Sequence, residues 1–309
     1  MLGMTVVLAA LLAVNYSEML KLVKTAEENE LVAIIDTLSS EINAQGLQAQ
    51  SLSALVAGIP QVQKAFAEKD RKALEAYFVP QFAKLKAEYG VRQFQFHLPP
   101  ATSFLRVHKP AKFGDDLSGF RKTVVATNGT EKAVRGIEVG VAGLGIRGIV
   151  PVFYQNRHVG SVEFGLSLDK HFLQRFAKKH DVELSLSLLR DNGLQPFAET
   201  LNLQTLFEQH DRSSALNNEA VFTQGKLDKL DVTIFSRAVR NFSDEKIGVM
   251  TLVRDRSQYV EQINNINSIM LLLGLLGLML AGGLAWIISR SVTAPMEEAC
   301  VAMREIASG

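Results

Sequence analysis

Three arginines stand among apolar or glycine-rich neighbours in the middle of the chain: Arg106, Arg121 and Arg147. The stretch 94–165 around them holds nine Lys or Arg against five Asp or Glu, whereas the whole chain of 309 residues is nearly balanced, with 33 against 32. A guanidinium offers a planar fork of donors that fits a carboxylate bidentately. We therefore predict that this stretch binds a small anionic or zwitterionic molecule, such as an organic acid or an amino acid.

Other polar and aromatic side chains near these arginines complete the predicted site. His97 and His108 flank a predicted hairpin, and Tyr154 ends a predicted strand, where it could line the floor of a pocket. The predicted ligand-binding residues are Arg106, His108, Arg121, Glu138, Arg147, Tyr154, His97 and Asp115. For each arginine, a structural salt bridge with Asp115, Asp116 or Glu138 is an equally good explanation. An aromatic residue on a strand is also more often part of the core.

Patterns for metal, cofactor and phosphate binding are weak. The six histidines are scattered without an i,i+4 pair or a cysteine partner, so we predict no metal site and no cofactor. The glycine-rich run 140–148 superficially suggests a phosphate-binding loop, but strand-like residues 149–154 follow it where a helix N-terminus is required. These glycines favour a bulge or a close backbone approach beside the pocket instead.

Charge and cysteine content exclude further classes. The net charge of +1 gives no basic excess for a nucleic-acid backbone, so we predict no nucleic-acid partner. The one cysteine, Cys300, lies beyond an apolar run near the C-terminus, so no disulfide is predicted. A membrane-anchored periplasmic enzyme using His97, His108, Asp115 or Asp116 is a second hypothesis. No nucleophile elbow or triad-like pattern supports it, so we predict no catalytic residues.

Two apolar runs indicate a membrane protein. Residues 269–288 are twenty in number and uncharged, about the length that crosses a hydrocarbon core of about 30 Å. Trp286 and Arg290 at its end are typical of an interfacial ring and a positive-inside anchor. The shorter run 1–16 lacks a positive n-region and a clear cleavage site, and we interpret it as the incomplete end of a first span. Residues from about 17 to 268 are then outside the membrane.

Helical periodicity dominates the chain before the arginines. Apolar residues recur every three or four positions over 17–57, which predicts a long stalk helix. Its apolar face could form a homodimer seam, or could pack only within its own domain. The residues 58–60 break it, and a second helical stretch follows over 61–88 with a kink or junction at Pro80. Gly90 is typical of a helix C-cap.

Strand-like runs then alternate with short helices. Residues 91–98 alternate apolar and polar as a half-buried strand does, and 102–108 is predicted as its hairpin partner. The residues 115–118 offer N-caps for a short helix, and Asn128-Gly129 predicts a turn. Strands are predicted again within 134–154 and 158–168.

A weaker copy of this order follows. Helices are predicted over 170–179 and 203–209, and strands over 182–189, 220–222, 230–240 and 246–254. The resulting fold class is α+β, with a long N-terminal helix carrying two antiparallel-sheet modules flanked by transmembrane helices.

The order of long helix, two modules, spanning helix and juxtamembrane helix resembles the double Cache (tandem PAS-like) sensor domains of bacterial chemoreceptors, sensor kinases and diguanylate cyclases. The specific part is SFLRVHKPAKFGDDLSGFR followed by GIEVGVAGLGIRGIVPVFY and HVGSVEFG, within 94–165. The predicted boundaries are 1–16 for the first span, 17–57 for the stalk, 58–168 for the membrane-distal module, 169–256 for the membrane-proximal module, 257–268 for the juxtamembrane helix, 269–288 for the second span and 289–309 for a linker start.

Residues 290–309 resemble the first helix of a HAMP linker. A proline follows shortly after the membrane arginine, and apolar residues recur at heptad-like steps. Pro295 in a first helical turn and Thr293 as its N-cap are both favoured at a helix start, so they predict that a helix begins here. Because no second HAMP helix or output domain follows, we expect the sequence to be a truncated receptor.

The resemblance implies a multi-pass receptor of the bacterial inner membrane, with a periplasmic sensor domain and cytoplasmic signalling partners. Chemotaxis is the predicted output, and a histidine kinase or diguanylate cyclase is the alternative. A third hypothesis is a scaffold that dimerises through 17–57, binds no small molecule and contacts a periplasmic protein.

Overall fold

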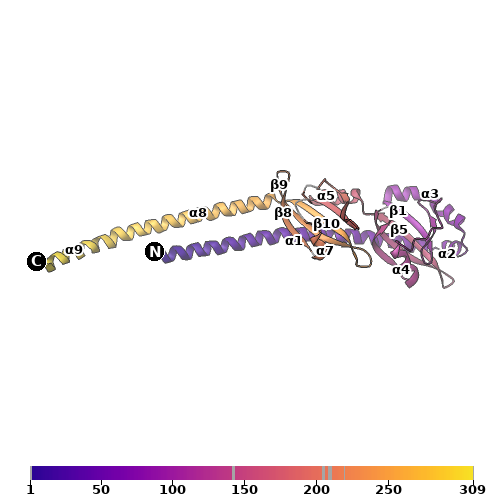
Figure 1. The fold of residues 1–309 in the computed structure, drawn as a ribbon, viewed down its shortest axis with the longest axis horizontal. Coiled ribbons are helices and arrows are strands. Elements are labelled where there is room, and N and C mark those ends of the chain that lie inside the picture. The colour runs from indigo at the N-terminus through magenta and orange to yellow at the C-terminus, as the bar shows by residue number, and fades with distance from the viewer. Residues whose placement is uncertain (1, 141–142, 204–205, 208–210, 219, 309) are drawn as a thin grey trace. The chain divides into compact units, whose positions relative to one another are not determined.

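A computed structural model describes residues 2–140, 143–203, 206–207, 211–218 and 220–308. The chain divides into two compact units, Leu31–Asp255 and the pair of segments Met1–Glu30 and Arg256–Gly309. The first unit holds two five-stranded antiparallel sheets, and an apolar helix lies in the second (Figure 1). The predicted fold class, a long N-terminal helix with two PAS-like modules and a C-terminal apolar helix, is therefore confirmed.

Three helices precede the first sheet. Helix α1 (Leu2–Ala57) is continuous, and α2 (Pro60–Ala67) and α3 (Arg71–Tyr89) follow it. The predicted junction at Pro80 is wrong, because the break lies at Lys69, whose φ is 58°, and at Asp70, which caps α3 by accepting from the Ala73 N–H at 3.0 Å. Pro80 lies inside α3, and Gly90 ends that helix in the left-handed conformation as predicted.

The first sheet has the strand order β2-β1-β5-β4-β3. Its elements are β1 (Val91–Leu98), β2 (Thr102–Arg106), α4 (Lys122–Thr130), β3 (Val134–Gly140), β4 (Gly143–Tyr154) and β5 (Arg157–Ser167). Strand β1 has the predicted bounds. All neighbouring strands pair antiparallel.

Helix α4 begins later and ends later than the sequence predicts. The predicted N-caps at 115–118 are wrong, because Asp116 instead accepts from the Ser118 N–H at 2.9 Å within a turn. The Glu138 carboxylate of β3 takes the capping role by accepting from the Thr123 N–H at 2.8 Å. The predicted turn at Asn128-Gly129 is also wrong. Both residues lie in α4, where buried Asn128 donates its amide to the Pro100 carbonyl at 3.0 Å.

The two faces of the first sheet carry different side chains. Phe94 and Phe164 stack at 4.2 Å between ring centroids in the apolar core. Helix α1 lies against this face, where buried Ser53 donates to the Gly148 carbonyl and accepts from the Phe164 N–H. A Cβ at Gly148 would overlap the α1 backbone, so the close approach requires glycine there. Because side chains alternate along a strand, the polar residues next to these phenylalanines in β1 and β5 face away from α1.

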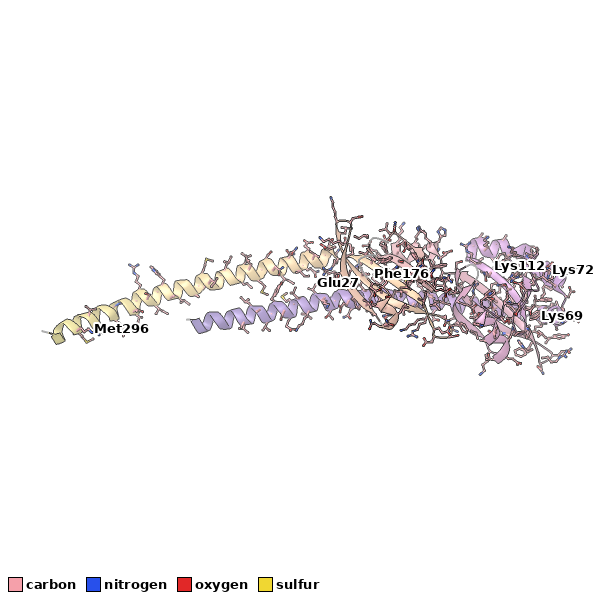
Figure 2. All side chains as sticks on the ribbon, viewed as in Figure 1. Glu27, Lys69, Lys72, Lys112, Phe176 and Met296 are labelled. Carbon is pink, nitrogen blue, oxygen red and sulfur yellow. The ribbon has the colours of Figure 1, made fainter. Side chains whose placement is uncertain are left out.

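The second sheet has the order β7-β6-β10-β9-β8. Its elements are α5 (Lys170–His180), β6 (Glu183–Arg190), β7 (Gly193–Glu199), α7 (Ser214–Asn217), β8 (Val221–Leu227), β9 (Leu230–Arg240) and β10 (Lys246–Asp255). Phe176 of α5 is buried in the body of this module (Figure 2). Strand β7 was not predicted. It contains Pro196, which is tolerated because β7 lies at the edge of the sheet. The predicted helix 203–209 falls largely outside the described residues.

The other unit contains the C-terminal helices α8 (Ser257–Ile288), the π-helical turn η1 (Ser289–Thr293) and α9 (Ala294–Ser308). Within the described residues, one helix is long and apolar enough to cross a membrane, Ser257–Thr293, whose mean hydropathy reaches 2.4 over 18 residues, none buried. The run 1–16 stays a prediction as a span. The N-cap predicted at Thr293 is wrong, because helical structure continues through it.

A salt bridge and a hydrogen bond join the start of α8 to α1 within this unit. Arg256 Nε lies 3.2 Å from Glu27 Oε1, and Glu27 is buried. Three residues later in each helix, the Tyr259 hydroxyl donates to Glu30 Oε2 at 2.6 Å. The apolar helix is thus anchored to α1 at the point where it begins.

Candidate functional site

A network of buried charged side chains lies on the face of the first sheet that points away from α1. Its centre is Glu163 of β5, whose side chain is 0% exposed. Arg121 Nη2 lies 2.5 Å from Glu163 Oε1, and Arg147 Nη1 lies 3.5 Å from the same oxygen. The other carboxylate oxygen lies 2.9 Å from His97 Nε2. We call these residues, with Glu138, the charged face.

Arg121 joins α4 to two strands of the sheet. It immediately precedes α4, and besides contacting Glu163 it donates from Nε to Glu138 Oε2 of β3 at 2.8 Å. The Thr123 hydroxyl donates to the same oxygen at 2.8 Å. Glu138 therefore fixes the start of α4 through backbone and side-chain hydrogen bonds together, and movement of Glu138 would be transmitted to the helix.

Arg147 of β4 lies flat over a patch of glycines. Its guanidinium donates to Gln93 Oε1 of β1 at 2.5 Å and has a side chain only 5% exposed. An added Cβ at Gly145 would lie 2.6 Å from the guanidinium carbon, and one at Gly165 would overlap Nη1. The Arg147 side chain thus needs both glycines for its space, whereas the predicted close backbone approach is made by Gly148 against α1.

Burial and mutual charges set the protonation of the charged face. Burial alone would raise the pKa of Glu163, but Arg121, the His97 hydrogen bond and Arg147 outweigh it and hold that pKa well below its usual range. Burial lowers the pKa of His97 more than Glu163 raises it, so the ring is neutral near pH 7. Burial, together with the charge of Arg121, lowers the pKa of Arg147 to about 10, which leaves it protonated.

Several buried polar atoms on and over this face have no hydrogen-bond partner within the described residues. Arg147 Nε is an unpaired donor, and Gln95 Oε1 is an unpaired acceptor. His97 donates from Nε2 to the ionised Glu163, so its Nδ1 is a second unpaired acceptor. The Ser161 hydroxyl is also unpaired. Buried polar groups normally find partners, so this face retains hydrogen-bonding capacity of both kinds for a small polar molecule.

The structure brings together four of the eight predicted site residues: His97, Arg121, Glu138 and Arg147. The remaining four lie elsewhere. Arg106 forms a bidentate salt bridge with Asp115, at 2.6 and 2.7 Å, and its hydrogen bond lowers the pKa of that carboxyl. The His108 Nδ1 lies 3.3 Å from the Phe94 carbonyl, and burial lowers its pKa. Tyr154 ends β4 beside Arg157.

Sequence reasoning missed the central carboxylate, Glu163, together with Gln93 and Thr123. A signal for Glu163 exists in the sequence, since it is the one acidic residue in the apolar run of β5. A lone charge in a strand whose neighbours are buried needs an internal partner. Gln93 and Thr123 carry no comparable signal, because each is an ordinary polar residue at an element's start.

The described residues contain no group of three or more His, Cys, Asp or Glu side chains placed to hold a metal ion. The charged face itself contributes two carboxylates and one histidine, each already bound to an arginine or to one another. The charged side chains of this face can form charge-assisted hydrogen bonds with polar groups.

Two successive five-stranded antiparallel sheets of one topology define a tandem PAS-like fold, with a buried charged face on the first sheet. The family model for the "double sensory domain of two-component sensor kinase" matches residues 24–260. The chain belongs to this family of double Cache sensor domains, as its sequence resemblance suggested. No curated protein matches it in sequence.

Solved structures with similar folds include the ligand-binding domain of the Campylobacter jejuni chemoreceptor Tlp3 in complex with 4-methylisoleucine. It has 14% identity and a TM-score of 0.48, over 79% of this chain and 93% of that one. The ligand-binding domain of Mlp24 with asparagine has 15% identity and a TM-score of 0.40, over 84% and 98%. The Tlp3 domain with L-valine has 14% identity and a TM-score of 0.46, over 80% and 97%. The family assignment rests on the family model.

Proposed function

We propose that the chain is the sensory part of a transmembrane receptor, and that the charged face binds a small zwitterionic or anionic molecule, an amino acid or organic acid. The observation that carries this proposal is the buried network around Glu163, with its unpaired donor and acceptor atoms. Buried charges are costly in a fold that only needs a core. A ligand-binding role gives that cost a function.

Charge balance favours a zwitterion over a simple anion. Arg121 and Arg147 are matched by Glu138 and Glu163, and His97 is neutral, so the face has no net charge to attract an anion. The ligand's carboxylate is assigned to Arg147, whose Nε is unpaired and whose contact with Glu163 is the longer one. Its ammonium group is assigned to the unpaired acceptors Gln95 Oε1 and His97 Nδ1.

Binding at this face would act on α4 and then on the path to the membrane. Arg121 and Glu138 connect the ligand site to the start of α4, so a shift of either residue changes how α4 packs on the sheet. Output requires only that the ligand bind one arrangement better than another. Near the membrane, the Glu27–Arg256 and Glu30–Tyr259 contacts connect α8 to α1 and are the proposed points where the change is passed on.

The proposed setting is the bacterial inner membrane, with the two sheets in the periplasm. Residues 1–16 and α8 are the proposed spans, and α9 is the proposed start of a HAMP linker that leads to a cytoplasmic output. Chemotaxis signalling is the favoured output, and a histidine kinase or diguanylate cyclase is the alternative. The gene sequence downstream of the Gly309 codon distinguishes these outputs directly.

A homodimer along α1 is part of the proposal. Leu47 and Leu55 are 53% and 69% exposed on this helix, and residues eight apart lie near one face. Disulfide trapping with Leu55→Cys in a Cys300→Ser background tests it. Crosslinked dimers should form with Leu55→Cys and not with Arg157→Cys, at the exposed start of β5.

The ligand proposal is tested by thermal unfolding of the full chain in lipid nanodiscs against a library of amino acids and organic acids. A ligand at 100 times its Kd should stabilise by about 2.7 kcal/mol. Arg147→Gln should abolish the shift, while Arg157→Gln, at the exposed start of β5, should retain it. A stabilising ligand whose shift survives Arg147→Gln would contradict the assigned site. No shift with any amino acid or organic acid would contradict the ligand class and favour a purely structural network.

A further inference from the structure

A cavity lies within the unit Leu31–Asp255, separate from the charged face. It has a volume of about 340 Å³, within the range of small-molecule sites. Its walls come from α1, from β3 and β4 of the first module, and from β9, β10 and the turn after β9 of the second. The apolar lining consists chiefly of Ile35, Leu38, Ile42, Ile137, Ile146 and Val239.

This cavity and the charged face lie on opposite faces of the same sheet. Ile146 and Arg147 are neighbours in β4, so their side chains point in opposite directions. Ile146 lines the cavity, and Arg147 belongs to the charged face. A molecule in the cavity would therefore be a second ligand, bound independently of the site proposed above.

The cavity lies where the two modules meet. The Phe242 N–H of the second module donates to the Ile137 carbonyl of the first at 3.2 Å. Gly136 has φ of 151°, and an added Cβ there would lie 2.7 Å from the Phe242 Cβ, so the approach depends on glycine. Ile137, Gly136 and Phe242 all line the cavity. Whatever fills it contacts both modules and α1 together.

The charged residues that line the cavity are all basic. They are Arg135, Arg237 and Arg240, and no acidic side chain lines it. Arg237 pairs with Asp36 at 2.5 Å, and Arg240 pairs with Asp244 at 3.2 Å. Arg135 differs from both, because its hydrogen bond at 2.8 Å goes to the neutral amide of Gln50. Within the described residues Arg135 has no carboxylate partner, so its positive charge is available to an anion.

We propose that this cavity binds an amphipathic monoanion, an alkyl or aryl carboxylate, with its apolar part against the isoleucines and its carboxylate on Arg135. Apolar walls provide the burial of the hydrocarbon. A guanidinium without an acidic partner provides a charge-assisted hydrogen bond for the head group. Such a ligand would modulate the sensor from the joint between its modules.

The test uses cysteine protection in the full chain in lipid nanodiscs. Cys300, the one cysteine, is replaced by serine to give a silent background. Ser39, exposed and lining the cavity mouth, is then changed to cysteine. Ser40→Cys is the matched control, because Ser40 is also exposed on α1 but does not line the cavity. The rate of thiol labelling is measured with sodium octanoate and with 1-octanol.

Octanoate should slow the labelling of Ser39→Cys about fivefold or more at saturation and leave Ser40→Cys unchanged. Arg135→Gln should raise the half-protecting octanoate concentration about tenfold, the scale of one charge-assisted hydrogen bond. Equal slowing at both positions, or no slowing at Ser39→Cys, would overturn the site. Equal protection by 1-octanol, or an unchanged concentration in Arg135→Gln, would overturn the assigned ligand class.

Discussion

The two modules share one topology but differ in what their sheets bury. In the first, Gln95 and His97 lie opposite Glu163 and Ser161. In the second, the corresponding positions of β6 and β10 are Ser185 and Ser187 opposite Thr251 and Val249. Over these central pairs both sheets pair residue opposite residue, and the side chains differ.

The second sheet buries hydroxyl groups where the first buries charges. Ser236 and Thr251 exchange a hydrogen bond of 3.0 Å, and Ser187 accepts from Arg212 at 2.7 Å. Arg212 is half-buried at the edge, and burial lowers its pKa. A hydroxyl pair satisfies itself at little cost, whereas a buried carboxylate needs cations around it. The fold is thus common to both modules, and the buried charge network is specific to the first.

The largest effect on stability is expected from substituting the matched residues Glu163 and Thr251, each in its own variant. Glu163→Gln keeps the shape but leaves Arg121 and Arg147 with one carboxylate between them. We expect a loss of about 3–5 kcal/mol in the first module, because buried cations lose their compensation. Thr251→Val should cost about 1 kcal/mol in the second module.

Hydrogen exchange of the strand amides in the full chain measures both changes separately. Amides of β1 and β5 report the first module, and those of β6 and β10 report the second. Similar losses for the two substitutions would show that the charges of the first module are no more structurally demanding than hydroxyls.

A smaller effect on stability distinguishes a glycine that makes room for a side chain from one that makes room for the backbone. Gly165→Ala places a Cβ against the Arg147 guanidinium and should destabilise by about 1–3 kcal/mol. In an Arg147→Ala background the clash is gone, so Gly165→Ala should cost much less. Gly248→Ala in the second module would overlap the Ser187 carbonyl, which no side-chain substitution removes. A double-mutant cycle by denaturant unfolding measures the coupling between Gly165→Ala and Arg147→Ala. Strict additivity of their free-energy changes would contradict the contact between the Arg147 guanidinium and Gly165.

Acid should weaken the first module more than the second. Burial lowers the pKa of His97 and of His108, so below about pH 6.5 the unfolded chain takes up protons that the folded one does not. Each such proton lowers stability by about 1.4 kcal/mol per pH unit. The depressed pKa of Glu163 adds stability above about pH 4.3 that is lost as the pH falls further.

The variant His97→Gln should reduce the slope of the free energy of unfolding against pH between about pH 6.5 and 4.3, by at most the slope that one proton contributes. Strands β6 to β10 contain no histidine, so amides there provide the internal control. The pH dependence of amide exchange in each sheet is the measurement. Equal pH dependence in both sheets, unchanged by His97→Gln, would show that the histidine does not titrate as described.

The sequence was sufficient for elements whose signals are local. Strand β1 alternates apolar and polar residues over its whole length, and Gly90 marks the end of α3. Elements fixed by distant contacts were predicted poorly. Helix α4 starts where Glu138, fifteen residues from Thr123, caps it, and Asn128 stays helical because it binds the Pro100 carbonyl. No local pattern contains these interactions.

The candidate site was predicted in part for the same reason. The apolar residues around Arg121 and Arg147 in the sequence were enough to select both, because a buried guanidinium needs a partner wherever it lies. Arg106 gave the same signal and proved to be paired with Asp115, only nine residues away. The sequence alone does not reveal which face of a sheet a loop covers, so Tyr154 and His108 could not be separated from the residues of the charged face.

The most direct test of the account is hydrogen exchange of the full chain in nanodiscs with and without a stabilising amino acid or organic acid found by thermal unfolding. The account predicts that ligand protects amides of β1, β4, β5 and the start of α4, around Arg147 and Glu163, and that Arg147→Gln abolishes this protection. Protection centred on β6, β9 and β10 instead would contradict it, since it would place the ligand on the hydroxyl-lined sheet of the second module.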